Sequence, residues 1–128
     1  MNGREGRAKD NRRQKGAAAE QAAADLLLSK GYRIRDRNWR CRSGELDVIA
    51  EDGGVIVFVE VRSRTTGTSF GTAAESVNFR KIRQVRSTAE VYLHAQRLED
   101  REIRFDVVAV KLGRDLSIAA MDHIQGAF

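Results

Sequence analysis

The sequence predicts one α/β or α+β domain in which a mixed β-sheet is flanked by helices. With 128 residues, the chain is long enough for one domain with a sizeable core, since a domain of that size buries roughly two thirds of its unfolded surface. Segments with helical periodicity alternate with apolar segments rich in β-branched residues, which is the pattern of a sheet covered by helices. Two of the apolar segments are joined by Asp52-Gly53-Gly54, which predicts a β-hairpin.

The first fifteen residues are expected to form a basic, disordered arm in front of a folded domain that spans residues 16–128. The arm contains six Lys or Arg residues and two acidic residues, so it holds four of the five net positive charges of the chain. A segment with this much charge has few apolar side chains to bury, which favours disorder.

The segment between Gly16 and Gly31 is rich in Ala and Leu and has a basic residue before its closing glycine, so it predicts a helix. The apolar stripe of this helix includes Ala24 and Leu27, and Glu20 lies at helical spacing within that stripe. Two interpretations of Glu20 stay open: a boundary residue that reaches solvent, or a carboxylate directed into a polar site.

The remainder of the chain predicts strands around a second helix. Weak alternation at 32–35 indicates a short strand, and residues 38–44 are typical of a loop. A polar stretch at 63–71 leads into the second helix, for which Thr72 and Asn78 are equally suitable N-caps. The other expected strands span residues 45–51, 55–62, 103–112 and 116–121.

The predicted hairpin brings two carboxylates together. With residues 53–54 as a two-residue turn, continued antiparallel pairing sets Asp47 directly opposite Glu60. The same register sets Glu45 opposite Arg62. One face of this hairpin is wholly apolar, whereas the Asp47 face is apolar only near the turn and is charged at its far end. This pattern describes a strand pair that leaves a core and opens into a cleft.

Directly opposed carboxylates need a positive partner, because like charges about 5 Å apart destabilise a sheet. A Mg²⁺ or Mn²⁺ ion would offset the repulsion, since both ions take oxygen ligands from carboxylates, water and substrate phosphate. The alternative is neutralisation by Arg62, two residues beyond Glu60. In phosphodiester cleavage the metal would activate a bound water, and a nearby cation would stabilise charge that develops in the transition state.

The net charge of +5 and the sequence pI of about 9.9 favour a polyanionic partner. Arginines crowd the segment 33–42, and basic residues crowd the segment 80–86, so nucleic acid, most simply DNA, is favoured over a merely solvated surface. The residues expected to contact nucleic acid are Arg37, Arg40, Arg42, Arg64, Arg80 and Arg83.

The cysteine content and hydropathy predict a soluble, cytoplasmic protein that does not enter a membrane. Cys41 is the single cysteine and cannot form an internal disulfide. No apolar run approaches the roughly 18 residues that span a bilayer, and the charged N-terminus differs from a secretion signal. His94 and His123 lack metal-ligand spacing and are expected to be incidental.

The segments Gly44–Ala50 and Phe58–Arg64 resemble those of the YraN family of bacterial proteins. This family is similar to archaeal Holliday-junction resolvases within the PD-(D/E)XK nuclease superfamily. The resemblance covers nearly the whole chain beyond the arm. It further includes Gly16, Glu20, Gly31-Tyr32, Arg37-Asn38, Phe70-Gly71, Lys81, Tyr92-Leu93, residues 104–108 and Ala127-Phe128.

The resemblance implies a restriction-endonuclease-like fold with a site at the hairpin. It implies that Asp47 and Glu60 are metal ligands and that Glu20 is an accessory acid at the same site. Arg62 departs from the family pattern, because it stands where the signature lysine of the superfamily is expected. Lys81, on the second helix, could supply the missing ammonium, or it could be an ordinary solvated lysine.

Three functions are consistent with these features. The first is a Mg²⁺- or Mn²⁺-dependent endonuclease that acts on DNA, by analogy on branched DNA, with a catalytic set of Glu20, Asp47, Glu60, Arg62 and Lys81. The second is a catalytically degenerate module that binds nucleic acid, which the arginine at position 62 favours. The third is a scaffold whose basic surfaces bind an acidic protein partner. The likeness to resolvases also implies a homodimer.

Overall fold

The computed structural model describes residues 3–66 and 77–128, with side chains from residue 12 onward. The predicted N-cap Thr72 therefore lies outside the described residues. The described helices and strands are α1 (Gly3–Ser29), β1 (Arg33–Cys41), β2 (Gly44–Asp52), β3 (Val55–Thr65), α2 (Phe79–Ala95), β4 (Ile103–Leu112) and β5 (Ile118–Ile124). Neither of these two helices combines the length and the apolar character needed to cross a lipid bilayer.

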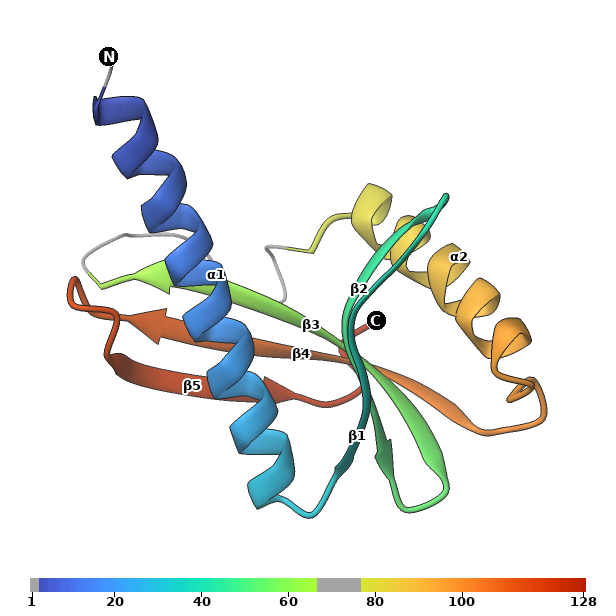
Figure 1. The fold of residues 1–128 in the computed structure, drawn as a ribbon. Coiled ribbons are helices and arrows are strands. Elements are labelled where there is room, and N and C mark those ends of the chain that lie inside the picture. The colour runs from blue at the N-terminus through green and yellow to red at the C-terminus, as the bar shows by residue number, and fades with distance from the viewer. Residues whose placement is uncertain (1–2, 67–76) are drawn as a thin grey trace.

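The strands form one mixed sheet in the order β1-β2-β3-β4-β5. β3 and β4 are parallel, and every other neighbouring pair is antiparallel. Parallel neighbours need a crossover connection, and the chain between β3 and β4 contains α2. Figure 1 shows α1 lying across the sheet and α2 beside the β1–β2 hairpin. The predicted single α+β domain is confirmed, and its arrangement is consistent with the restriction-endonuclease-like fold.

Two apolar clusters hold the helices against opposite faces of the sheet. The cluster under α1 includes Val48, Ala50, Val57, Val59 and Val108. The cluster under α2 includes Ile49, Phe58, Phe105, Val85 and Tyr92. Neighbouring residues of β2 and of β3 thus enter different clusters, which is the period of two expected for strands that are covered on both faces.

α1 begins well before the predicted helix start. Residues 3–15, which the sequence predicts as a disordered arm, continue the helix. Arg, Lys, Gln and Ala are good helix formers, and the chain contains no proline that would interrupt them. The part that faces the sheet lies where the sequence predicts it, and its buried residues include Ala19, Ala22, Ala23 and Leu27. Gly31 follows the helix with a φ of 87°, a conformation that glycine adopts without strain.

The predicted hairpin register is confirmed next to the turn. β2 pairs with β3 from Asp52↔Val55 to Val48↔Val59, as expected. Within the described strands the ladder ends there, so the further ladder pairs Asp47↔Glu60 and Glu45↔Arg62 do not form. Figure 1 shows the reason: the β1–β2 hairpin leaves β3 and runs toward α2.

Contacts with α2 hold the tip of the β1–β2 hairpin. Thr88 Oγ1 on α2 donates a hydrogen bond to Ser43 Oγ in the hairpin turn, over 3.3 Å. Gly44 has a φ of +149°, and a Cβ atom added there would lie 2.9 Å from Gln84 Nε2 on α2. The hairpin tip and α2 therefore approach closely, which separates β2 from β3 at Asp47.

Other boundaries differ modestly from the expected ones. β1 is longer than the predicted strand at 32–35 and includes part of the predicted loop, because this polar edge segment pairs with β2 through its backbone. α2 begins after Asn78, whose Oδ1 accepts a hydrogen bond from the Lys81 amide at 3.0 Å, so the Asn78 cap is confirmed. β4 has its predicted bounds, and β5 ends three residues later than expected.

A buried polar network ties the end of the chain to the sheet. Asp106 on β4 is 0% exposed. It accepts hydrogen bonds from Arg104 Nε at 2.9 Å, His123 Nε2 at 2.8 Å and the Gly126 amide at 3.0 Å. Burial would raise the pKa of Asp106, but the hydrogen bonds from Arg104, Gly126 and His123 hold it below its ordinary value.

His123 has a structural partner on each ring nitrogen. Lys30 Nζ lies 2.8 Å from Nδ1, and Asp106 lies 2.8 Å from Nε2. An ammonium only donates hydrogen bonds, so Nδ1 accepts and Nε2 carries the proton given to Asp106. His123 thus has a role in the buried network, which its isolated position in the sequence does not indicate.

Candidate functional site

The carboxylates of Asp47 and Glu60 lie where β2 and β3 separate. Alternation along the strands places Asp47 on the face of Ile49 and Glu60 on the face of Phe58, and α2 covers this face. Asp47 Oδ2 accepts a hydrogen bond from the backbone amide of Val61 at 2.9 Å. The two carboxylates are therefore neighbours, although their residues are not a ladder pair.

Glu60 is a buried carboxylate with one close cation. It is 2% exposed, and Lys81 Nζ on α2 lies 3.4 Å from its Oε1. Burial and, after it, the charge of Asp47 raise the pKa of Glu60 to about 7, although Lys81 and Arg62 oppose this shift. The sequence leaves the role of Lys81 open, and the structure places its ammonium at the carboxylate pair.

Asp47 is shifted in the same direction. Burial is the main cause of its raised pKa, while the Val61 amide and the charge of Lys81 lower it. Glu45 adds a smaller unfavourable charge. Burial thus disfavours the charged form of both carboxyl groups by more than the neighbouring cations offset.

Arg62 does not neutralise the pair through hydrogen bonds. Its electrostatic effect on both carboxylates is smaller than that of Lys81. Within residues 12–66 and 77–128, its Nε is a buried nitrogen that has no hydrogen-bond partner. Neutralisation of the two carboxylates by Arg62, the alternative that the sequence leaves open, is therefore weakly supported.

Glu20 approaches this region from α1 without joining the pair. Burial is the main reason that the pKa of Glu20 is raised, a side-chain hydrogen bond with Asn38 opposes the shift, and the charge of Asp47 adds to it. Glu20 is thus within electrostatic reach of Asp47. In the described ranges, however, no three His, Cys, Asp or Glu side chains form a group that could hold a metal ion.

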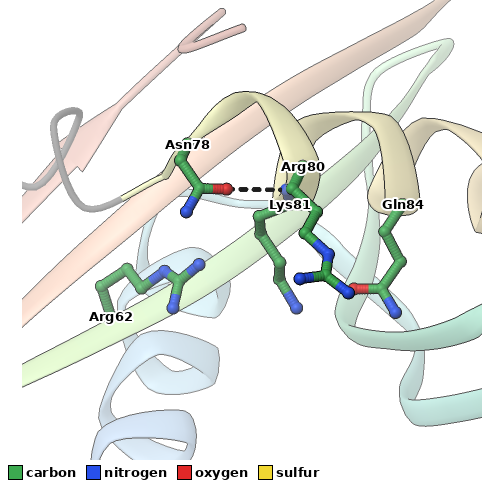
Figure 2. A pocket seen from close by; sticks show the side chains of 5 residues that line it. All are labelled: Arg62, Asn78, Arg80, Lys81 and Gln84. Carbon is green, nitrogen blue, oxygen red and sulfur yellow. Dashed lines mark hydrogen bonds between the residues drawn. The ribbon is translucent and has the colours of Figure 1, made fainter.

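The six arginines expected to contact nucleic acid lie in three places. Those on β1 and the turn after it are exposed: Arg37, Arg40 and Arg42. Arg64 on β3 lines a different pocket, to which Lys111 and Asp122 also contribute. Arg80 and Arg83 are exposed on the first turns of α2. Of these six, Arg80 shares a pocket with Arg62 and Lys81 (Figure 2).

The chemistry of the pair fits a divalent cation. Carboxylate oxygens are hard donors of the kind that Mg²⁺ and Mn²⁺ prefer, and Mg²⁺ often uses one or two carboxylates with water and phosphate completing its coordination. Burial, as the main cause of the raised pKa values of Asp47 and Glu60, disfavours their charged forms, and a bound divalent cation would offset this. Asp47 and Glu60 are the residues that would hold it.

In metal-free protein, Glu60→Gln is expected to increase stability at pH 8 and to have little effect at pH 4. The folded-state pKa of Glu60 is raised from 4.5 to about 7. The stability of the wild type is therefore highest at pH values below the unfolded-state pKa of Glu60. It falls as the pH rises from there toward the folded-state pKa. The shift sets an upper bound of about 3 kcal/mol, and we expect a gain of about 1–3 kcal/mol. Urea denaturation in EDTA at both pH values measures it.

Glu90→Gln is the matched control, because Glu90 is an exposed residue of α2. Its effect on the free energy of unfolding should stay within about 0.5 kcal/mol at both pH values. A loss of stability for Glu60→Gln at pH 8 would contradict the assignment of an uncompensated buried carboxylate.

By its fold, the chain is a single-domain α+β protein, with an acidic pair at the point where two central strands diverge. It belongs to the uncharacterised protein family UPF0102, whose model matches residues 19–110. This range includes Glu20, Asp47, Glu60 and Lys81. The match confirms the YraN resemblance that the sequence motifs indicate.

Bacterial relatives are similar over most of the chain. A UPF0102 protein of Moorella thermoacetica is 50% identical over 117 residues, which are 91% of this chain and 97% of the relative. A UPF0102 protein of Myxococcus xanthus is also 50% identical over 117 residues, 91% of this chain and 90% of the relative. One of Mycolicibacterium vanbaalenii is 45% identical over the same length, 91% of this chain and 95% of the relative.

Proposed function

We propose that the protein is a divalent-metal-dependent endonuclease that acts on DNA. The observation that carries the proposal is the pair of neighbouring carboxylates, the half-buried Asp47 and the buried Glu60, next to the ammonium of Lys81. Lys81 Nζ lies 3.4 Å from Glu60 Oε1, so a lysine ammonium is present at the carboxylates although Arg62 occupies the position of the signature lysine. The departure at position 62 thus does not leave the site without a lysine.

Asp47 and Glu60 would hold Mg²⁺ or Mn²⁺, which when bound supplies Lewis acidity and a water of lowered pKa. Lys81 would stabilise the negative charge that develops on the phosphoryl oxygens. Arg62 would bind and orient the phosphate through the donors of its guanidinium group. Glu20, within electrostatic reach of Asp47, would add a carboxylate at the edge of the site.

The exposed arginines support a DNA substrate. Arg37, Arg40 and Arg42 lie on the β1–β2 hairpin that also carries Asp47, and Arg80 and Arg83 lie on α2, which carries Lys81. Such contacts to phosphates position DNA without reading its sequence. Action in the cytoplasm agrees with the free Cys41. The homodimer implied by the likeness to resolvases would be visible in light scattering.

Cleavage of labelled DNA tests the proposal. Wild-type protein with Mn²⁺ is expected to nick a four-way junction or a flap, and EDTA should abolish this. Absence of cleavage on junction, flap and duplex with either Mn²⁺ or Mg²⁺ would contradict an endonuclease.

The salt dependence of DNA binding separates the two remaining functions. Affinity that falls steeply with salt, without cleavage, would identify a non-catalytic nucleic-acid-binding module, since phosphate contacts release counterions. Absence of DNA binding would favour a scaffold for an acidic protein.

A further inference from the structure

A basic pocket lies between β3 and the first turns of α2. It has a volume of about 400 Å³ and is lined by Arg62, Asn78, Arg80, Lys81 and Gln84. Figure 2 shows Arg62 on β3 on one side of the pocket, and the side chains of Arg80 and Lys81 extending from α2 on the other. Three of the five lining residues are cations, and none of the five is acidic.

The pocket fits a phosphate group of a nucleic-acid backbone. Lys81 already contacts Glu60 at 3.4 Å, and arginine and lysine bind phosphate oxygens through charge-assisted hydrogen bonds. The buried Nε of Arg62 has no hydrogen-bond partner among the described residues, so this guanidinium has a donor that is not used within the protein.

An exposed aromatic residue lies beside this pocket in the chain. Phe79 is the first residue of α2, and its neighbours Asn78 and Arg80 both line the pocket. Its exposed fraction is 86%, the highest among the exposed large hydrophobic residues of the described chain. Phe79 therefore contributes little to the core, which leaves its ring free to contact another molecule.

Two arginines follow Phe79 closely on α2. Arg83 is one helical turn further along α2, so it lies on the same helix face as Phe79. Arg80 is the next residue in the chain and lines the pocket. Aromatic rings next to a positively charged groove are the combination by which proteins hold single-stranded nucleic acids, because each base stacks on a ring and each phosphate meets a cation.

We propose that the N-terminal turn of α2 is a subsite for an unpaired nucleotide, whose base stacks on Phe79 and whose phosphate meets Arg83 on the same helix face, while a neighbouring backbone phosphate lies in the pocket. The proposal rests on the proposed function in that the bound strand is the one presented to Asp47 and Glu60. It deepens that function by naming the substrate class: DNA with unpaired bases, at a branch, a flap or a frayed end. A base inside a duplex is stacked on its neighbours and is not free to contact the ring.

Phe79→Ala tests the subsite in EDTA, so that binding is measured without cleavage. We expect the variant to bind fluorescein-labelled oligothymidylate about tenfold more weakly than the wild type does, within the range that base stacking on aromatic residues contributes. Its affinity for a blunt duplex should change less than about twofold. Phe79→Trp should bind oligothymidylate at least as tightly as the wild type, because a larger ring replaces the phenyl group.

The matched control is Val91→Ala, which truncates another exposed apolar residue of α2. It should leave both affinities unchanged, and circular dichroism should show that both variants are folded. The proposal is overturned if the wild type does not bind oligothymidylate. It is also overturned if Phe79→Ala weakens duplex and single strand equally, or weakens neither.

The outcomes for the subsite and for the endonuclease are separable. Selective weakening by Phe79→Ala in a protein that cleaves no DNA would support the subsite and reject the endonuclease. Cleavage of junctions by a Phe79→Ala variant that binds like the wild type would support the endonuclease and reject the subsite.

Discussion

Asp47→Asn is expected to lower the rate of Mn²⁺-dependent DNA cleavage by more than about a hundredfold. Loss of groups that only orient metal ligands already costs about 10–100-fold, and asparagine removes the charge of a ligand itself. The fold should persist, because the side-chain oxygen of Asn can accept the hydrogen bond that the Val61 amide donates to Asp47 Oδ2 in the wild type. Single-turnover cleavage of a labelled junction with excess protein measures the effect on the chemical step.

Asp100→Asn is the control for this measurement, because Asp100 is exposed in the segment before β4. The substitution also removes one negative charge, but at a position distant in the sequence from the carboxylate pair. The variant should therefore retain the wild-type rate of cleavage. Cleavage that persists in purified Asp47→Asn would show that the activity does not come from this site.

Asp106→Ala is expected to lower the free energy of unfolding by about 3–5 kcal/mol, the usual cost of breaking a buried ion pair. The carboxylate is fully buried, and its removal leaves Arg104 and the 2%-exposed side chain of His123 without their common acceptor. Because the pKa of Asp106 is held below its ordinary value, this contribution is present above the unfolded pKa and is lost as the pH falls through the folded one. Urea denaturation at pH 7 measures it.

Asp122→Ala, in the exposed part of β5, is the corresponding control and should change the free energy of unfolding by less than about 0.5 kcal/mol. A loss below about 1 kcal/mol for Asp106→Ala would contradict the structural role of the network, since Asp106 is the buried acceptor that Arg104, His123 and the Gly126 amide share.

The hairpin was predictable because its signal is local. The turn at residues 53–54 and the period of two along each strand are enough to set the register, and the structure confirms it up to Val48↔Val59. The helix boundary at Asn78 and the strand 103–112 are likewise local features. The neighbouring positions of Asp47 and Glu60 follow from the same register, even though the ladder ends one residue before them.

The divergence of β2 from β3 was not predictable, because it depends on tertiary contacts. The tip of the β1–β2 hairpin lies against α2 through Ser43 and Thr88, residues far apart in the sequence. The ion pair of Glu60 with Lys81 depends on the same placement of α2. Helical periodicity or a turn motif contains no information about distances between residues of different helices and strands.

Two other features needed coordinates for a different reason. Asp106 and His123 lie on different strands, and only their hydrogen bond shows that they belong together. The exposure of Phe79 contradicts the usual expectation for a large aromatic residue, so its sequence position gives no sign of it. A search for aromatic residues next to clustered cations would have selected Phe79 as a candidate, without predicting its exposure, because Arg80, Lys81 and Arg83 follow it closely.

The central claim is that Asp47 and Glu60 share one divalent cation, and anomalous diffraction from crystals grown with Mn²⁺ tests it most directly. The account predicts an anomalous peak within coordinating distance of an oxygen of each carboxylate, and no such peak in Asp47→Asn. Manganese bound elsewhere in the wild type, with both carboxylates left without a metal ligand, would contradict it.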